Sequence, residues 1–127
     1  MTVSPQLQRA CEQAIAMLME EVKGAKAAVI STEDGFEVAA RVENTAQVSR
    51  LAAMASSMAA LGAIVGEESN LGYCHNLVVQ AQEGMIVMSQ AKRSDVDLIL
   101  SVVTGKDAVM GQLIYTTRSA IALLQSA

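Results

Sequence analysis

The chain has 127 residues and a formal net charge of −4, and 52% of its residues are hydrophobic while only 17% are charged. This length fits a single domain, 1–127, that can bury its own core. The acidic balance argues against nucleic acid and anionic membrane surfaces as partners, and three aromatic residues are too few for a platform that stacks bases.

The first predicted element is a helix over residues 5–22. Ser4 suits its N-cap, and Pro5 suits its first position. Apolar residues recur at helical spacing along one face, namely Leu7, Cys11, Ala14, Ile15, Leu18 and Val22. Gly24 is suited to the left-handed residue that often ends a helix.

Two strands are predicted next, over residues 25–31 and 36–42. The segment Glu33-Asp34-Gly35 between them is typical of a hairpin turn. The second strand alternates apolar residues with Glu37 and Arg41, as expected for a solvated edge. Asn44 or Thr45 is then expected to cap a helix.

That helix, over residues 48–66, is the most unusual stretch of the chain. It has no charge from Leu51 to Gly66, and its Ala, Leu and Met residues favour a helix. One stripe carries large side chains, and these are Leu51, Met54, Met58, Leu61 and Val65. The adjacent stripe carries small residues, and these are Ala52, Ala55, Ala59, Gly62, Ala63 and Gly66.

A helix that is apolar nearly all round needs cover on more than one side. The chain's own sheet can cover one side, and a second copy of the chain is the simplest cover for another. Two alternatives stay open, a transmembrane helix and a helix buried inside a monomer. A membrane span needs about 20 strongly apolar residues, whereas this run is shorter and interrupted by Ser56 and Ser57. A monomer of this size buries a limited share of its surface.

Three further strands are predicted over residues 73–81, 85–90 and 95–104, and a last helix is expected with Asp107 as its N-cap. The fold class is therefore α/β, a single-domain sandwich in the order helix-strand-strand-helix-strand-strand-strand-helix. The expected sheet is five-stranded and antiparallel, in the order 2-1-5-4-3, with helices on both faces.

This strand order leaves the third strand at an edge, and residues 76–81 carry no charge there. An uncharged edge favours pairing with another chain. We therefore expect a homodimer through the central helix and the third strand. Its predicted interface consists of Leu51, Ala52, Ala55, Met58, Ala59, Gly62, Ala63, Gly66, Leu77 and Val79.

No pattern in the sequence indicates catalysis, so no catalytic, metal-binding or cofactor-binding residue is assigned. Cys74 and the single histidine, His75, are adjacent and would point to opposite faces of a strand. Asp95 and Asp97 fit a solvated loop better than an acid–base pair. The first twenty residues contain Arg9, Glu12 and Glu20 and lack a signal-peptide core, so we expect a cytoplasmic protein with reduced cysteines.

Several short segments, taken in order, resemble the roadblock / dynein light chain domain family, including its bacterial Mgl-type members. They are Val22-Lys23-Gly24-Ala25, Asp34-Gly35-Phe36, Leu51-Ala52-Ala53-Met54-Ala55, Leu61-Gly62, Gly111 and Ala120-Ile121. The resemblance covers essentially the whole chain. It implies an α/β sandwich that dimerises through its central helix and third strand.

The resemblance also implies that the chain binds and regulates a small Ras-like GTPase. The alternatives are a dimeric scaffold or motor adaptor that leaves nucleotide turnover unchanged, and a small-molecule sensor. An arginine supplied in trans is one route to faster hydrolysis, and Arg41, Arg50, Arg93 and Arg118 are the candidates. The expected partner surface consists of Arg50, Ser56, Ser57, Ala60, Ile64, Glu67 and Glu68. No membrane insertion is expected.

Overall fold

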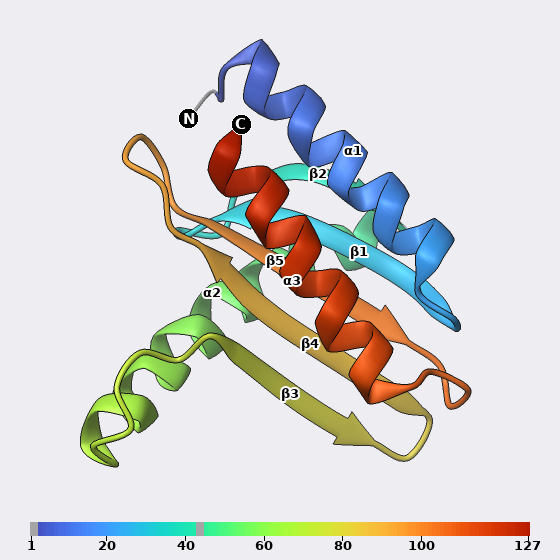
Figure 1. Ribbon diagram of the computed structural model, residues 1–127, viewed down its shortest axis with the longest axis vertical. Coiled ribbons are helices and arrows are strands. Elements are labelled where there is room, and N and C mark those ends of the chain that lie inside the picture. The colour runs from blue at the N-terminus through green and yellow to red at the C-terminus, as the bar shows by residue number, and fades with distance from the viewer. Residues whose placement is uncertain (1–2, 43–44) are drawn as a thin grey trace.

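A computed structural model describes residues 3–42 and 45–127 of the chain. Its elements follow the predicted order of helices and strands (Figure 1). They are α1 (Pro5–Glu21), β1 (Ala25–Thr32), β2 (Glu37–Arg41), α2 (Thr45–Glu68), β3 (Asn76–Ala81), β4 (Gly84–Ala91), β5 (Leu98–Thr104) and α3 (Met110–Ser126).

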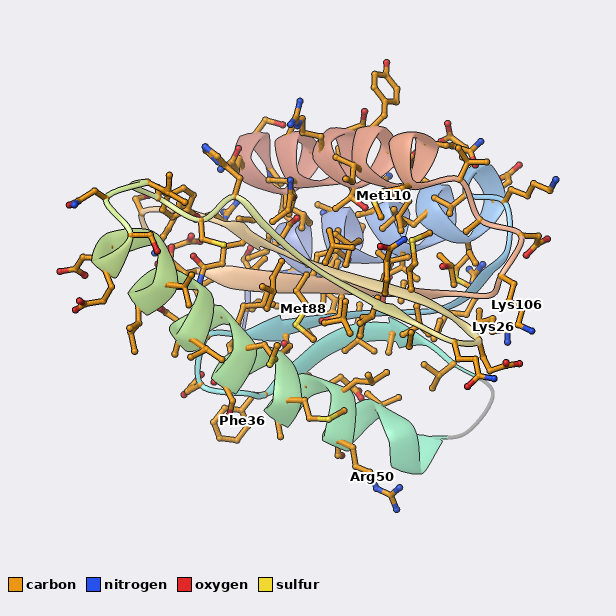
Figure 2. The ribbon with its side chains drawn as sticks, turned by 90° about the horizontal axis from the view of Figure 1, so that it is seen from below. Lys26, Phe36, Arg50, Met88, Lys106 and Met110 are labelled. Carbon is orange, nitrogen blue, oxygen red and sulfur yellow. The ribbon has the colours of Figure 1, made fainter. Side chains whose placement is uncertain are left out.

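The five strands form one antiparallel sheet in the order β2-β1-β5-β4-β3, as predicted. β1 and β5 pair in the middle, although they come from opposite ends of the chain. α1 and α3 cover one face of the sheet and α2 lies on the other, so the domain has three layers (Figure 2). β3 pairs with β4 and forms one edge of the sheet.

The two faces of the sheet are packed by side chains of different size. Under α1 and α3 the core is built from large aliphatic residues that are almost fully buried, including Leu18, Ile30, Leu100 and Leu124. Under α2 the buried helix residues are small, mainly Ala52 and Ala55, which pack beside Val29 and Ile99. The larger core therefore lies on the α1 and α3 side, and α2 contributes little to it.

Local signals place the first elements as expected. The Ser4 hydroxyl accepts a hydrogen bond from the Leu7 amide at 3.1 Å, so Ser4 is the N-cap of α1. Gly35 has a φ of +94° in the hairpin turn, a backbone conformation that other residues rarely adopt. Asn44, one of the two expected caps of α2, lies outside the described residues.

Several boundaries differ from the prediction: α2 spans Thr45–Glu68 rather than residues 48–66, so Glu67 and Glu68 belong to the helix. Three further differences have a local cause. Asp107 is not the N-cap of α3, because the chain still turns at Ala108 and the capping position falls on Val109. β5 begins at Leu98 rather than at residue 95, because the Asp97 carboxylate accepts a hydrogen bond from the Arg93 amide and holds a turn.

The third difference concerns β3, which begins at Asn76 rather than at residue 73. The preceding residues run back along the end of α2, which extends to Glu68. The Leu71 and Gly72 amides both donate to the Gly66 carbonyl, at 2.9 and 3.1 Å. This segment therefore ends α2 before the chain can enter the sheet.

Candidate functional site

The small-residue stripe of α2 faces the chain's own sheet and the segment that leads into β3. Ala52, Ala55, Gly62 and Gly66 are buried there. A Cβ atom on Gly66 would collide with the Gly72 carbonyl oxygen, and one on Gly62 would stand 3.1 Å from the Cys74 sulfur. Small residues are needed on this stripe because backbone and side-chain atoms of the same chain press against it.

The opposite surface of α2 exposes large apolar side chains. Met54, Leu61, Ile64 and Val65 are each 50 to 56% exposed. No charged residue lies among them, because the chain has none from Leu51 to Gly66. Contiguous exposed apolar surface of this kind marks an interaction site more often than the scattered apolar residues of ordinary surfaces.

Two members of the large-residue stripe, Leu51 and Met58, lie on the flank of α2 beside β3. Leu51 lines an apolar groove of about 370 Å³ together with Val79 and Ile86. Met58 packs beside Leu77 over the same part of the sheet. On the other flank, the Ser56 hydroxyl donates to the Glu33 carbonyl at 2.6 Å and ties α2 to the β1–β2 turn.

The predicted dimer interface is thus divided between the interior and the surface. Four of its ten residues, namely Ala52, Ala55, Gly62 and Gly66, are buried within the chain. Leu51, Met58, Ala59 and Leu77 are partly exposed, and Ala63 and Val79 are exposed. Met54, Leu61 and Val65 belong to the same exposed surface but were absent from the predicted interface. All three belong to the large-residue stripe of the sequence.

The predicted partner surface lies mostly on the outer side of α2. Arg50, Ser57, Ala60, Ile64, Glu67 and Glu68 are all exposed, and Ser56 is half-buried. Arg50 projects away from the sheet (Figure 2). Its charge and those of Glu67 and Glu68 stand at the two ends of the uncharged stretch.

The four candidate arginines occupy different places. Arg93 donates to the Leu124 and Ala127 carbonyls at the end of α3 and to Asp95 at 2.8 Å, so its guanidinium is engaged within the chain. Arg41, Arg50 and Arg118 are exposed, and only Arg50 lies on α2. Arg93 also holds the pKa of Asp95 down, to about 2, through their side-chain hydrogen bond.

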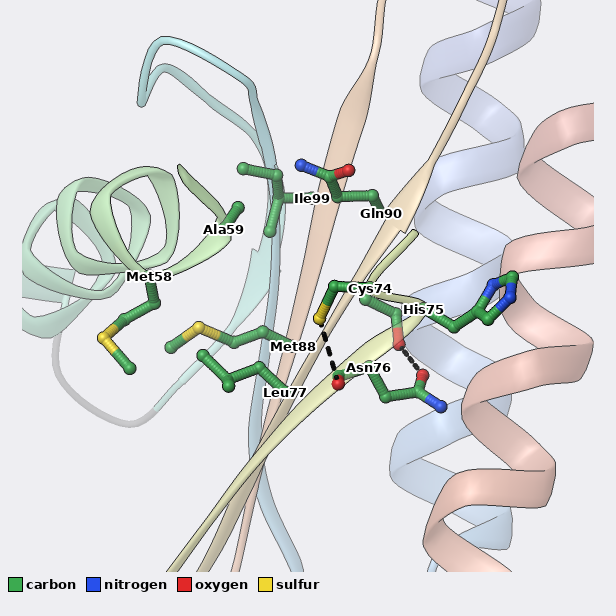
Figure 3. A pocket seen from close by; sticks show the side chains of 10 residues that line it. Met58, Ala59, Cys74, His75, Asn76, Leu77, Met88, Gln90 and Ile99 are labelled. Carbon is green, nitrogen blue, oxygen red and sulfur yellow. Dashed lines mark hydrogen bonds between the residues drawn. The ribbon is translucent and has the colours of Figure 1, made fainter. Parts of the chain in front are cut away.

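Cys74 and His75 diverge, as the sequence predicted, although they lie just before β3 rather than within it. Figure 3 shows the Cys74 sulfur and the His75 ring projecting in different directions, with the ring toward α3. The Cys74 thiol donates to the Asn76 carbonyl at 3.4 Å, and the His75 ring meets the Tyr73 ring edge to face. Within residues 3–42 and 45–127, no three His, Cys, Asp or Glu side chains are placed to hold a metal ion.

By length and composition alone, the segment Val48–Glu68 of α2 is long and apolar enough to cross a membrane. It is the one such helix among the described residues, and the core helices of soluble proteins pass the same test. Here Ala52 and Ala55 pack on the sheet, and the outer side of the helix is exposed.

No protein-family model and no curated protein matches the sequence. Solved structures do match, at a TM-score of 0.80 for a Roadblock/LC7 domain from Streptomyces avermitilis, with 22% identity over 90% of this chain and 93% of that one. A gliding protein MglB from Thermus thermophilus matches at a TM-score of 0.83, with 16% identity over 98% of this chain and 93% of that one. An MglB described with a tetrameric arrangement matches at a TM-score of 0.84, with 16% identity over 98% of this chain and 92% of that one. The chain therefore has the fold of Roadblock/LC7 domains and MglB proteins.

Proposed function

We propose that this chain is a non-catalytic, homodimeric interaction module of the cytoplasm that binds and regulates a small Ras-like GTPase. The fold that it shares with Roadblock/LC7 and MglB structures supports this proposal, together with the sequence resemblance described above. The observation that carries it is the exposed, uncharged surface of α2 beside the unpaired edge of β3.

The proposed dimer places the large-residue stripe of α2 and the β3 edge against their symmetry mates. Pairing two β3 strands would continue the sheet and satisfy the backbone groups of both edges. The apolar groove beside Leu51 and Val79 would then be covered by the second copy. The exposed or partly exposed members of the proposed interface are Leu51, Met54, Met58, Ala59, Leu61, Ala63, Val65, Leu77 and Val79. A tetrameric arrangement of an MglB supports self-association of this fold.

The proposed GTPase surface is the outer line of α2, which a dimer would double into a continuous platform. It runs from Arg50 through Ser57 and Ile64 to Glu68. Arg50 is the one candidate arginine on this line, so it is the residue best placed to act in trans on a bound nucleotide. The alternative route is to stabilise one conformation of the GTPase switch loops, which needs no arginine.

The experiment is an affinity capture with this protein as bait, from a lysate of its source organism loaded with either GDP or a non-hydrolysable GTP analogue. The partner-surface variant is Ile64→Glu, and the control is Tyr115→Glu, which places the same charge on another exposed large residue, on α3. Light scattering checks that both variants keep the mass of the wild-type assembly.

A small GTPase retained in one nucleotide state by the wild type and the control, and lost by Ile64→Glu, would establish the regulator. Single-turnover hydrolysis with the purified pair, with and without Arg50→Ala, then separates the two routes of regulation. Recovery of other proteins without any GTPase in either state would instead establish the scaffold function.

A further inference from the structure

A second groove lies on the other face of the sheet, between α3 and the start of β3. α3 covers β4, whereas β3 extends beyond it and is not covered by a helix on this side (Figure 1). The groove measures about 470 Å³, within the usual range for ligand sites, and is open along one side. The residues that decide its chemistry are Asn76, Gln90, Lys92, Arg118, Ile121 and Ala122.

The hydrogen-bond pattern of this groove leaves donors facing outward. The Ser89 hydroxyl donates to Asn76 Oδ1, and the Tyr73 hydroxyl donates to Gln90 Oε1 at 3.1 Å. Both amide oxygens are therefore occupied from within the chain. The amide nitrogens of Asn76 and Gln90 have no acceptor among the residues that the structure describes.

The charges of the groove have one sign. Lys92 contributes an ammonium at one end and Arg118 a guanidinium from α3, and none of the lining residues is acidic. Arg118 is exposed and has no ion pair within residues 3–42 and 45–127. Lys92 is paired with Asp97 at 3.3 Å but keeps half of its side-chain surface exposed. This local positive charge contrasts with the net charge of −4 of the whole chain.

One wall of the groove is apolar. Ile121 and Ala122 of α3 line it, and the Tyr73 ring, held by its contact with His75, stands at the entrance to β3. An open groove of this kind screens a small anion poorly from water, and solvent weakens each ion pair. A peptide gains apolar contacts along the wall in addition to its charge pairs, so the mixed lining favours a peptide over a free anion.

We propose that this groove binds an acidic segment of a partner protein. Carboxylates of the segment would pair with Arg118 and Lys92 and accept from the Asn76 and Gln90 amides, while an apolar side chain packs on Ile121 and Ala122. The site lies on the opposite face of the sheet from α2. It is therefore independent of the proposed GTPase surface and would coexist with it.

The test is an NMR titration of the ¹⁵N-labelled full chain with the blocked peptide Glu-Leu-Glu-Leu-Glu. Saturable amide shifts are expected within residues 73–76, 89–92 and 118–125, and they should diminish as salt is raised. Arg118→Glu should weaken binding at least about tenfold, the usual size of one lost hydrogen bond to a charged group. Arg41→Glu, the same charge change on the exposed edge strand β2, should leave the affinity unchanged.

Two further titrations make the proposal refutable. The neutral peptide Gln-Leu-Gln-Leu-Gln should not bind, so equal affinity for it would contradict recognition by charge. Inorganic phosphate should bind far more weakly than the acidic peptide, so equal occupancy by phosphate would mean a small-anion site instead. The absence of localised shifts with the acidic peptide in the folded wild type would also overturn the proposal.

Discussion

Gly66 of α2 lies so close to Gly72 that no side chain fits between them. The Gly72 amide donates to the Gly66 carbonyl at 3.1 Å, and a Cβ atom at residue 66 would overlap the Gly72 carbonyl oxygen. This contact turns the chain back along α2 and aims it at β3. It also keeps Gly62 and Gly66 of the small-residue stripe inside the chain.

The first prediction concerns this contact. Gly66→Ala should destabilise the domain by about 1–3 kcal/mol, the usual cost of forcing an atom into a packed site, less the gain in helix propensity. Gly111→Ala is the matched control, because nothing lies within 4 Å of a Cβ at that position of α3. It should leave stability unchanged or raise it by up to about 1 kcal/mol. Urea unfolding followed by circular dichroism measures both, and equal midpoints for the two variants would refute the contact.

The second prediction concerns self-association. Leu61→Glu places a charge on the exposed stripe of α2 without disturbing the core, since Leu61 is 52% exposed. We expect the dimer to separate into folded chains of 13.3 kDa. Light scattering coupled to size exclusion measures the mass, and circular dichroism confirms the fold. Tyr115→Glu on α3 should keep the dimer, and a Leu61→Glu dimer of unchanged mass would exclude this stripe from the interface.

The third prediction concerns Arg93. Its guanidinium joins the end of α3 to the β4–β5 turn through the Leu124 and Ala127 carbonyls and Asp95. Arg93→Ala should lower the free energy of unfolding by about 1–3 kcal/mol, the range for hydrogen bonds to a charged group. Arg93→Lys should restore only part of this loss, because an ammonium cannot make the paired bonds of a guanidinium.

Chemical denaturation should compare the two Arg93 variants with Arg118→Ala. This control removes an exposed arginine that forms no ion pair with the residues that the structure describes. A loss for Arg118→Ala as large as that for Arg93→Ala would show that the engaged geometry of Arg93 is not the cause.

The fourth prediction concerns Cys11 of α1, which is fully buried in the core. Its burial raises the pKa of the thiol from 9.0 to about 11. Between pH 9 and about 11 the thiol therefore stays protonated in the folded state but loses its proton in the unfolded chain. The contribution of this thiol to the free energy of unfolding is fully present below pH 9 and is lost as the pH rises from about 9 to about 11. Denaturation of wild type and Cys11→Ala across this range should show a steeper fall for the wild type.

Iodoacetamide labelling at neutral pH gives a second check on the same residue. Cys11 should stay unmodified in the native protein and react only on unfolding, whereas Cys74, which is partly exposed, should react first. Mass spectrometry of the peptides distinguishes the two sites.

The sequence predicted the order of the elements along the chain because the signals for them are local. Ser4 with Pro5 marks a helix start, Asp34-Gly35 marks a hairpin, and short alternating runs mark strands. The inward side of α2 could not be read in the same way, because both of its stripes are apolar. Gly62 and Gly66, one helical turn apart, were the available signal that another segment approaches closely.

The donor-rich groove was beyond sequence reasoning for a different reason. Lys92 and Arg118 lie far apart in the chain, and only the packing of α3 over β4 brings them to the same site. The direction of the Asn76 and Gln90 amides depends on hydroxyls from other residues. The hydrogen bonds of Arg93 could not be predicted either, because its acceptors are backbone carbonyls at the end of α3.

The pairing of β1 with β5 has a consequence for synthesis of the chain. The centre of the sheet joins Ala25 to Thr104 and Thr32 to Leu98, so it closes only after residues 98–104 have left the ribosome. Until then the uncharged stretch from Leu51 to Gly66 has no complete sheet to pack on. Contacts between distant segments slow folding and prolong the exposure of such stretches. The interval between synthesis of α2 and arrival of β5 is thus the period in which this protein is most prone to aggregate.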